Sequence, residues 1–156
     1  METLLNELTS GVLDLAQTLR VVLRILAATL VGAVIGWERE HTGKSAGLRT
    51  HMLVSLSSAI FVLAPLEAGM NIDELSRVIQ GVAAGIGFIG AGAILKLADA
   101  RVIEGLTTAA GIWLTAALGL AAGLGRFGLA AISAFLAWLI LALVARLEIR
   151  RSTHAA

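Results

Sequence analysis

The stretch VIQGVAAGIGFIGAGAILKL, from Val78 to Leu97, decides the fold, because it is mainly apolar and carries a single charge, Lys96. Its glycines from Gly85 onward fit the G-x-G-x-x-G pattern of dinucleotide-binding enzymes, and Glu104 lies where that pattern expects an acid. That fingerprint needs a β-branched strand before it and a helix that opens at it, whereas alanine and glycine precede it here. The same length and composition fit a helix that crosses a membrane, in which glycines let neighbouring helices approach. The stretch therefore predicts a membrane helix and no nucleotide site.

The composition of the whole chain is typical of a membrane protein. It has 156 residues, of which 58% are hydrophobic and 15% are charged, whereas soluble domains contain about 45 to 50% apolar residues. The formal net charge of +1 offers no electrostatic case for binding nucleic acid. The absence of cysteine excludes disulfides, thiolate metal sites and cysteine nucleophiles. We expect one domain in contact with the lipid bilayer, with no cofactor.

Five runs of mainly apolar residues predict five transmembrane helices, because about 20 residues at 1.5 Å each cross the hydrocarbon core. The joints between the runs are short and polar, so neighbours in sequence should be antiparallel neighbours in space. We predict an all-α, polytopic bundle of five transmembrane helices. The expected spans are residues 19–37, 48–66, 78–97, 106–124 and 127–145.

The chain divides into three expected regions. Residues 1–18 place leucines at helical spacing with acids between them, which predicts an amphipathic helix along the membrane face, or else an extension of the first span. The acids stand where a signal peptide has its basic region, so we expect this segment to be retained. Residues 19–146 form the transmembrane domain, and residues 147–156 form a short cytoplasmic tail.

Lysine and arginine are distributed unevenly between the two sides of the predicted bundle. The side of the first-to-second loop and the C-terminus holds twice as many as the opposite side. Because basic loops stay in the cytoplasm, we expect a periplasmic N-terminus and a cytoplasmic C-terminus. The acidic segment LEAGMNIDELSR, from Leu66 to Arg77, then faces outward and is expected to carry a short surface helix.

Polar residues at the cytoplasmic ends of the first two spans form a candidate functional cluster. Glu38, Arg39 and Glu40 end the first span, and the second begins with Arg49, Thr50 and His51. Two interpretations stay open. The charges could neutralise each other through Glu38–Arg49 or Arg39–Glu40 pairs. Alternatively, ionisable groups at membrane depth mark a site for a substrate, an ion or a partner.

No pattern in the sequence requires a metal ion or an enzymatic mechanism. The histidines His41 and His154 do not share a helix face with His51, so no zinc pair is predicted. Four cytoplasmic acids could offer oxygens to hydrated magnesium, although their spacing does not require it. These acids are Glu38, Glu40, Asp99 and Glu104. The hydroxyls of the second and fourth spans lack an Asp/His pair to activate them, so we expect them to bond to backbone carbonyls.

Arg24 is the deepest charge of the first span. Its long side chain could reach the outer headgroups, as we expect for Arg20. It could instead pair with one of the outer acids, Glu67, Asp73 or Glu74.

Small residues recur four positions apart on three of the spans, a spacing that lets membrane helices pack backbone to backbone. We expect a tight bundle that continues into a second subunit, giving a homodimer. So many glycines could equally leave the third span bent or partly unwound, with carbonyls exposed to an ion. The glycines expected at helix contacts are Gly32, Gly36, Gly81, Gly85, Gly87, Gly90, Gly92, Gly111, Gly119 and Gly123.

Four stretches follow one another along the chain: GAVIGWERE from Gly32, GLRTHMLVSLSSA from Gly47, GVAAGIGFIGAGAIL from Gly81, and EGLTTAAGIWLTAALGLAAG from Glu104. Together they resemble the MgtC/SapB family of bacterial inner-membrane proteins. The resemblance implies a five-span domain with its N-terminus outside. It implies association with low magnesium, with virulence, and with modulation of membrane machines such as pumps and the ATP synthase. The characteristic residues of the family map to Glu38, Arg39, Arg49, Thr50, His51, the glycines of the third span, Thr107 and Thr108.

Because the chain stops soon after the fifth span, it resembles the shorter, SapB-like form of the family. The leading hypothesis is a non-enzymatic inner-membrane protein that adapts the cell to magnesium limitation by contacting other membrane proteins. The alternative is a small cation transporter or channel, for which Mg²⁺ is one possible ion. Its pathway would run past the third span and past Glu38, Arg49 and His51.

Overall fold

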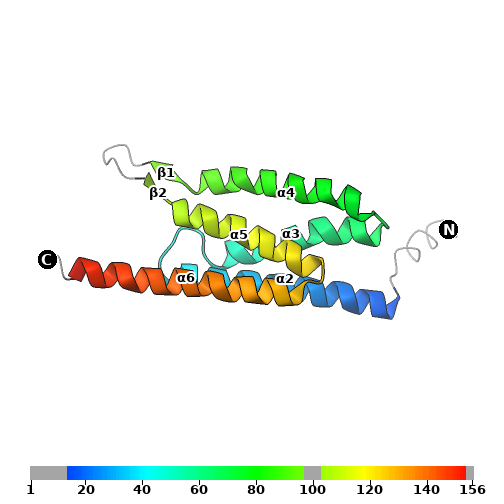
Figure 1. The fold of residues 1–156 in the computed structure, drawn as a ribbon, viewed down its shortest axis with the longest axis horizontal. Coiled ribbons are helices and arrows are strands. Elements are labelled where there is room, and N and C mark those ends of the chain that lie inside the picture. The colour runs from blue at the N-terminus through cyan, green and yellow to red at the C-terminus, as the bar shows by residue number, and fades with distance from the viewer. Residues whose placement is uncertain (1–13, 97–102, 154–156) are drawn as a thin grey trace, which may run out of the picture.

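The computed structural model describes residues 14–96 and 103–153, which form an elongated bundle of helices along one long axis (Figure 1). The helices are α2 (Leu15–His41), α3 (Leu48–Glu67), α4 (Ile72–Gly92), α5 (Leu106–Gly123) and α6 (Phe127–Thr153). The first turn of α2 and the last turn of α6 lie at opposite ends of the bundle. The predicted all-α bundle of five helices is confirmed.

The described helices have the length and surface of a membrane protein. Four of them, α2, α3, α4 and α5, are long and apolar enough to cross a membrane, and α6 contributes an apolar stretch over Phe127–Leu143. Large apolar side chains such as Leu30, Phe61 and Ile132 stand more than half exposed on the outside of the bundle. Such a surface is suited to contact with lipid rather than water.

Helices α2, α3 and α5 form the centre of the bundle, whereas α4 lies along one side and α6 along the other (Figure 1). The central contacts are tight because glycine brings the backbones together. A Cβ on Gly32 of α2 would lie 2.6 Å from the carbonyl oxygen of His51 in α3, and one on Gly119 of α5 would overlap the carbonyl of Ser55. Buried Ile35 and Leu118 pack beside these contacts.

The glycines of α4 differ from the expectation of packing within the chain. A Cβ on Gly81, Gly85, Gly87 or Gly92 would meet no atom within 4 Å, and only Gly90 lies near α5, 3.7 Å from Ala109. The physical reason is the position of α4 at the edge of the bundle, where one face contacts its neighbours. The helix is continuous from Ile72 to Gly92, so the alternative of an unwound third span is not observed.

The acidic segment from Leu66 to Arg77 does not form a separate surface helix, because Leu66 and Glu67 end α3 and the residues from Ile72 onward begin α4. The Asn71 side chain accepts a hydrogen bond from the Glu74 backbone at 2.9 Å, and the Glu74 carboxylate accepts one from the Asn71 backbone at 3.1 Å. This capping box satisfies two N–H groups at the helix start. Asp73 and Glu74 also complement the positive end of the helix dipole.

Some element boundaries differ from the predicted spans. Helix α2 begins at Leu15, inside the region expected as a separate N-terminal helix, whose residues 1–13 lie outside the described residues. Helix α6 continues to Thr153, past the expected end of the fifth span at residue 145 and into the expected tail of residues 147–156. Helical hydrogen bonds do not stop where the apolar run stops, so a helix can extend beyond the hydrocarbon core.

A short antiparallel ladder joins α4 to α5 and adds a small β element to the all-α fold. Strand β1 (Leu95–Lys96) pairs with β2 (Ile103–Glu104), in the register Leu95 to Glu104 and Lys96 to Ile103. Gly105 follows with a positive φ of 92°, and a Cβ there would overlap the Ala93 carbonyl. This position therefore requires glycine. Asp99, one of the candidate acids, lies outside the described residues.

Candidate functional site

Glu38 and Arg39 form a buried ion pair at the end of α2. The Arg39 Nε donates to the Glu38 Oε2 at 2.5 Å, and the two residues are 7% and 2% exposed. Charges removed from water need such a partner, because desolvation is costly. The pair differs from both predicted arrangements, Glu38 with Arg49 and Arg39 with Glu40. Arg49 does not pair with Glu38 because it lies exposed on α3, and Glu40 does not pair with Arg39 because it accepts a hydrogen bond from the Leu48 backbone.

Glu40 stabilises the start of α3 instead of pairing with an arginine. Its Oε2 accepts a hydrogen bond from the backbone N–H of Leu48 at 2.7 Å. The N-cap residue of α3 is Gly47, which has no side chain to fill this role. A Cβ on Gly47 would lie 2.8 Å from the same carboxylate oxygen, so glycine makes room for Glu40. Helix starts leave N–H groups unsatisfied, and Glu40 supplies one acceptor.

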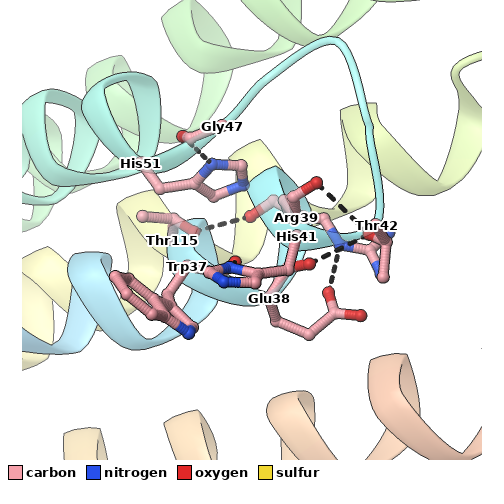
Figure 2. A network of polar contacts seen from close by, with 9 residues as sticks. Trp37, Glu38, Arg39, His41, Thr42, Gly47, His51 and Thr115 are labelled. Carbon is pink, nitrogen blue, oxygen red and sulfur yellow. Dashed lines mark hydrogen bonds and ion pairs between the residues drawn. The ribbon is translucent and has the colours of Figure 1, made fainter.

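His51 of α3 is completely buried where α3 packs against α2 and α5. Figure 2 shows His51 and neighbouring polar side chains. Its Nδ1 lies 2.9 Å from the Gly47 carbonyl, so Nδ1 carries the hydrogen and donates. Two glycines make room for the ring. A Cβ on Gly36 of α2 would lie 3.1 Å from the His51 Cβ, and one on Gly111 of α5 would lie 3.5 Å from Nε2.

Two buried side-chain atoms of this cluster have no hydrogen-bond partner in the described part of the chain, Glu38 Oε1 and His51 Nε2. With Nδ1 donating to Gly47, a neutral ring leaves Nε2 as an acceptor. A buried acceptor without a partner costs about 1 to 3 kcal/mol and calls for an explanation such as a water or an ion. The cluster of Glu38, Arg39 and His51 can therefore receive a group that donates hydrogen bonds or carries positive charge.

The remaining predicted site residues differ in exposure. Thr108 is buried near the start of α5, Thr107 beside it is exposed, and Glu104 is exposed on β2. Thr50 is half-buried on the first turn of α3. The functional role of these residues stays a prediction.

Two of the buried hydroxyls, those of Ser55 and Thr115, bond to backbone carbonyls, as expected for membrane helices. Thr115 Oγ1 donates to Gly111 in its own helix at 2.8 Å. Ser55 Oγ donates across the helix contact to Ala28 of α2 at 2.6 Å. Sequence reasoning missed this contact between helices, although Gly32 four residues after Ala28 signals that a neighbour can approach.

Arg24 bonds to the end of a helix rather than to an outer acid. Its Nη1 donates to the carbonyl oxygen of Gly123, in the last turn of α5, at 3.3 Å. The expected partner Glu67 bonds instead to Gln17. The last carbonyls of a helix lack partners within it and carry partial negative charge, so a guanidinium is a suitable donor. Gly125, which would place a Cβ 3.2 Å from Arg24, leaves room for this side chain.

A metal site is not evident in residues 14–96 and 103–153, where no group of three histidine or acidic side chains is arranged to hold an ion. The acids Glu38 and Glu40 are close in sequence, but one pairs with Arg39 and the other caps α3. One oxygen of each carboxylate is therefore engaged by the protein itself, whereas Glu38 Oε1 has no partner among the described residues.

Comparison with known families places these helices in context. The sequence model that describes the MgtC family matches residues 25–150 of this chain. The chain belongs to the MgtC family. The matched region contains the Glu38, Arg39 and His51 cluster together with all the glycines that bring α2, α3 and α5 together.

Several MgtC-family relatives are similar over much of the chain. Protein SrpB of Synechococcus elongatus is 47% identical over 136 residues, which cover 80% of this chain and 75% of SrpB. Protein MgtC of Salmonella typhimurium is 41% identical over 106 residues, 68% of this chain and 44% of that protein. The Escherichia coli protein named "Putative magnesium transporter YhiD" is 37% identical over 140 residues, 85% of this chain and 64% of YhiD. The chain thus spans less than half of the Salmonella protein, and no solved structure matches it.

Proposed function

We propose that this MgtC-family chain is a non-enzymatic protein of the inner membrane that adapts the cell to low magnesium or a related stress. It acts by modulating other membrane proteins, such as pumps or the ATP synthase. Family membership and the magnesium-related name of YhiD support the physiological setting. The distribution of lysine and arginine supports an orientation with the α2–α3 loop in the cytoplasm.

The distribution of buried polar groups along the bundle favours modulation of other proteins over transport of an ion. The buried ion pair and His51 lie at one end, and Arg24 bonds to α5 at the other end. Between them, Ser55 and Thr115 use backbone carbonyls as acceptors. An ion pathway needs polar groups at successive depths. The described helices place no charged side chain between these two ends, so an ion would meet only neutral groups there.

A second candidate function, transport of a small cation, is favoured by the two unpaired acceptors in the buried cluster. Glu38 Oε1 and His51 Nε2 lie at membrane-helix ends, where an ion that enters from the cytoplasm would meet them. Ionisable groups in such positions often mark ion routes. This candidate predicts that flux depends on Glu38.

Two measurements on the full chain separate the candidates. The purified protein is sealed into vesicles that contain a magnesium indicator, and the same variants are expressed in cells that grow in low magnesium. We expect no flux above that of empty vesicles, together with better growth that is lost in Glu38→Gln and kept in the control Lys44→Gln, which changes an exposed residue of the α2–α3 loop. Flux that wild type supports and Glu38→Gln abolishes would overturn modulation. Membrane abundance and helix content of both variants show whether a loss of growth reflects unfolding.

A further inference from the structure

Helix α4 exposes a face that no described part of the chain covers. Gly81 and Gly85 stand four residues apart on it, and a Cβ on either would meet no atom within 4 Å. Phe88, which is 85% exposed, and Gly92 continue the same face at helical spacing. We call these four residues the α4 face. Figure 1 shows α4 along one side of the bundle.

The other glycine pairs with four-residue spacing inside a helix, Gly32 with Gly36 and Gly119 with Gly123, are covered by another helix of the same chain. A Cβ on Gly32 would lie 2.6 Å from the backbone of His51, and one on Gly36 would lie 2.7 Å from that of Leu48. A Cβ on Gly123 would lie 2.8 Å from the backbone of Ala59. In this protein, the spacing therefore accompanies contact with another helix. For Gly81 and Gly85 that helix is not supplied by the described chain.

A groove of about 560 Å³ between α3 and α4 runs beside the α4 face and shares Gly81 and Gly85 with it. Its lining is mainly apolar, with Leu53 and Phe61 on α3 and Ile89 on α4. The groove opens to the outside of the bundle, where the exposed apolar side chains face lipid. It can therefore accept an apolar occupant from within the membrane.

Ser58 indicates what kind of occupant the groove fits. This residue lines the groove near the middle of α3, is 3% exposed, and makes no hydrogen bond to a described residue. An unpaired hydroxyl in apolar surroundings favours an occupant with an acceptor. A lipid acyl chain carries no acceptor at this depth. A helix that approaches over glycine brings backbone carbonyls, as α2 does where Ala28 accepts from Ser55.

We propose that the occupant is helix α4 of a second copy of this chain, with the two α4 faces crossing at Gly81 and Gly85. The surface is self-complementary, because the exposed Phe88 side chain lies beside the groove on the same copy. A two-fold axis then places Phe88 of each copy against the groove of the other. Both copies have the same orientation in the membrane, so the two α4 helices run parallel, as in glycine-mediated membrane dimers. The dimer goes beyond the proposed function and forms whether the chain modulates or transports.

The dissociation constant of the dimer in lipid vesicles tests this proposal. It is measured from the energy transfer between labelled copies at a series of protein-to-lipid ratios. Gly85→Leu adds bulk at the centre of the α4 face and should weaken the dimer at least tenfold. Gly87→Leu is the matched control, since Gly87 is equally open but points to another side of the same helix. It should change the constant less than twofold. A monomeric wild type, or equal weakening by both variants, overturns the proposal.

Two further variants test the contact directly. The chain has no cysteine, so a single introduced cysteine reports one position. Gly85→Cys should form disulfide-linked dimers under mild oxidation, whereas Gly87→Cys should not. Ser58→Ala should weaken the dimer about threefold, which is the change in affinity expected from the loss of one average hydrogen bond between membrane helices. Native mass spectrometry that finds one chain with bound lipid, and no dimer, identifies lipid as the occupant and overturns the proposal.

Discussion

Arg39 donates a hydrogen bond to the carboxylate of Glu38, its neighbour in sequence, with both side chains almost completely buried. Side chains at successive helix positions do not face each other, so the long arginine side chain must bend back to reach the carboxylate. The pair neutralises its own charge without Arg49 or Glu40. It leaves one carboxylate oxygen, Glu38 Oε1, for a group from outside the described chain.

Replacing Glu38 with glutamine should destabilise the bundle strongly. The substitution leaves the Arg39 guanidinium buried without its counter-charge, which costs about 3 to 5 kcal/mol in the free energy of unfolding. Denaturant titration of the protein in detergent, followed by circular dichroism, measures this loss. Arg49→Gln, at an exposed position, should change the same quantity by less than about 0.5 kcal/mol. Similar losses in both variants would contradict the buried pair.

Adding a methyl group to Gly119 should separate α5 from α3. A Cβ there overlaps the backbone of Ser55, which is not free to move aside. We expect Gly119→Ala to lower the free energy of unfolding by about 1 to 3 kcal/mol, the usual cost of overpacking. Gly87→Ala has open space around it and should be neutral or stabilise by up to about 1 kcal/mol through helix propensity. A stable Gly119→Ala protein would show that these helices do not pack as described.

Removing the charge of Arg24 should weaken the end of α5. Arg24→Gln loses the charged hydrogen bond to the Gly123 carbonyl, and we expect a loss of about 0.3 to 1 kcal/mol. Thermal unfolding in detergent can compare it with Arg20→Gln, which changes an exposed arginine one turn earlier. If Arg20→Gln costs as much as Arg24→Gln, the bond from Arg24 to Gly123 makes no specific contribution to stability.

Glu40 should control how tightly the first turn of α3 is held. Glu40→Ala removes the acceptor of the Leu48 N–H, and loss of a helix cap costs about 0.5 to 2 kcal/mol. Hydrogen exchange should become faster at the first backbone amides of α3, from Leu48 onward, while amides near the middle of α3 keep their protection. Glu104→Gln, an exposed acid on β2, serves as a control that leaves α3 unchanged. Unchanged exchange in Glu40→Ala would exclude the cap.

The spans were predictable because they depend on local composition and on the thickness of the hydrocarbon core. The predicted starts of the second, fourth and fifth spans coincide with the first residues of α3, α5 and α6. The start of α4 was missed because the segment from Ile72 to Arg77, in which four of six residues are polar, belongs to the helix through the Asn71 and Glu74 cap. Apolarity marks the membrane part of a helix, whereas capping marks its end.

The sequence by itself determined that this chain forms five helices in a membrane, since each apolar run must satisfy its own backbone hydrogen bonds there. Only the tertiary structure decided which groups meet. It joined Arg24 to Gly123, turned Arg39 back to Glu38, and left Gly81 and Gly85 open while Gly32 and Gly119 were covered. Spacing shows that a helix can be approached closely. Which helix approaches depends on how all five faces are packed at once, and that information is not local.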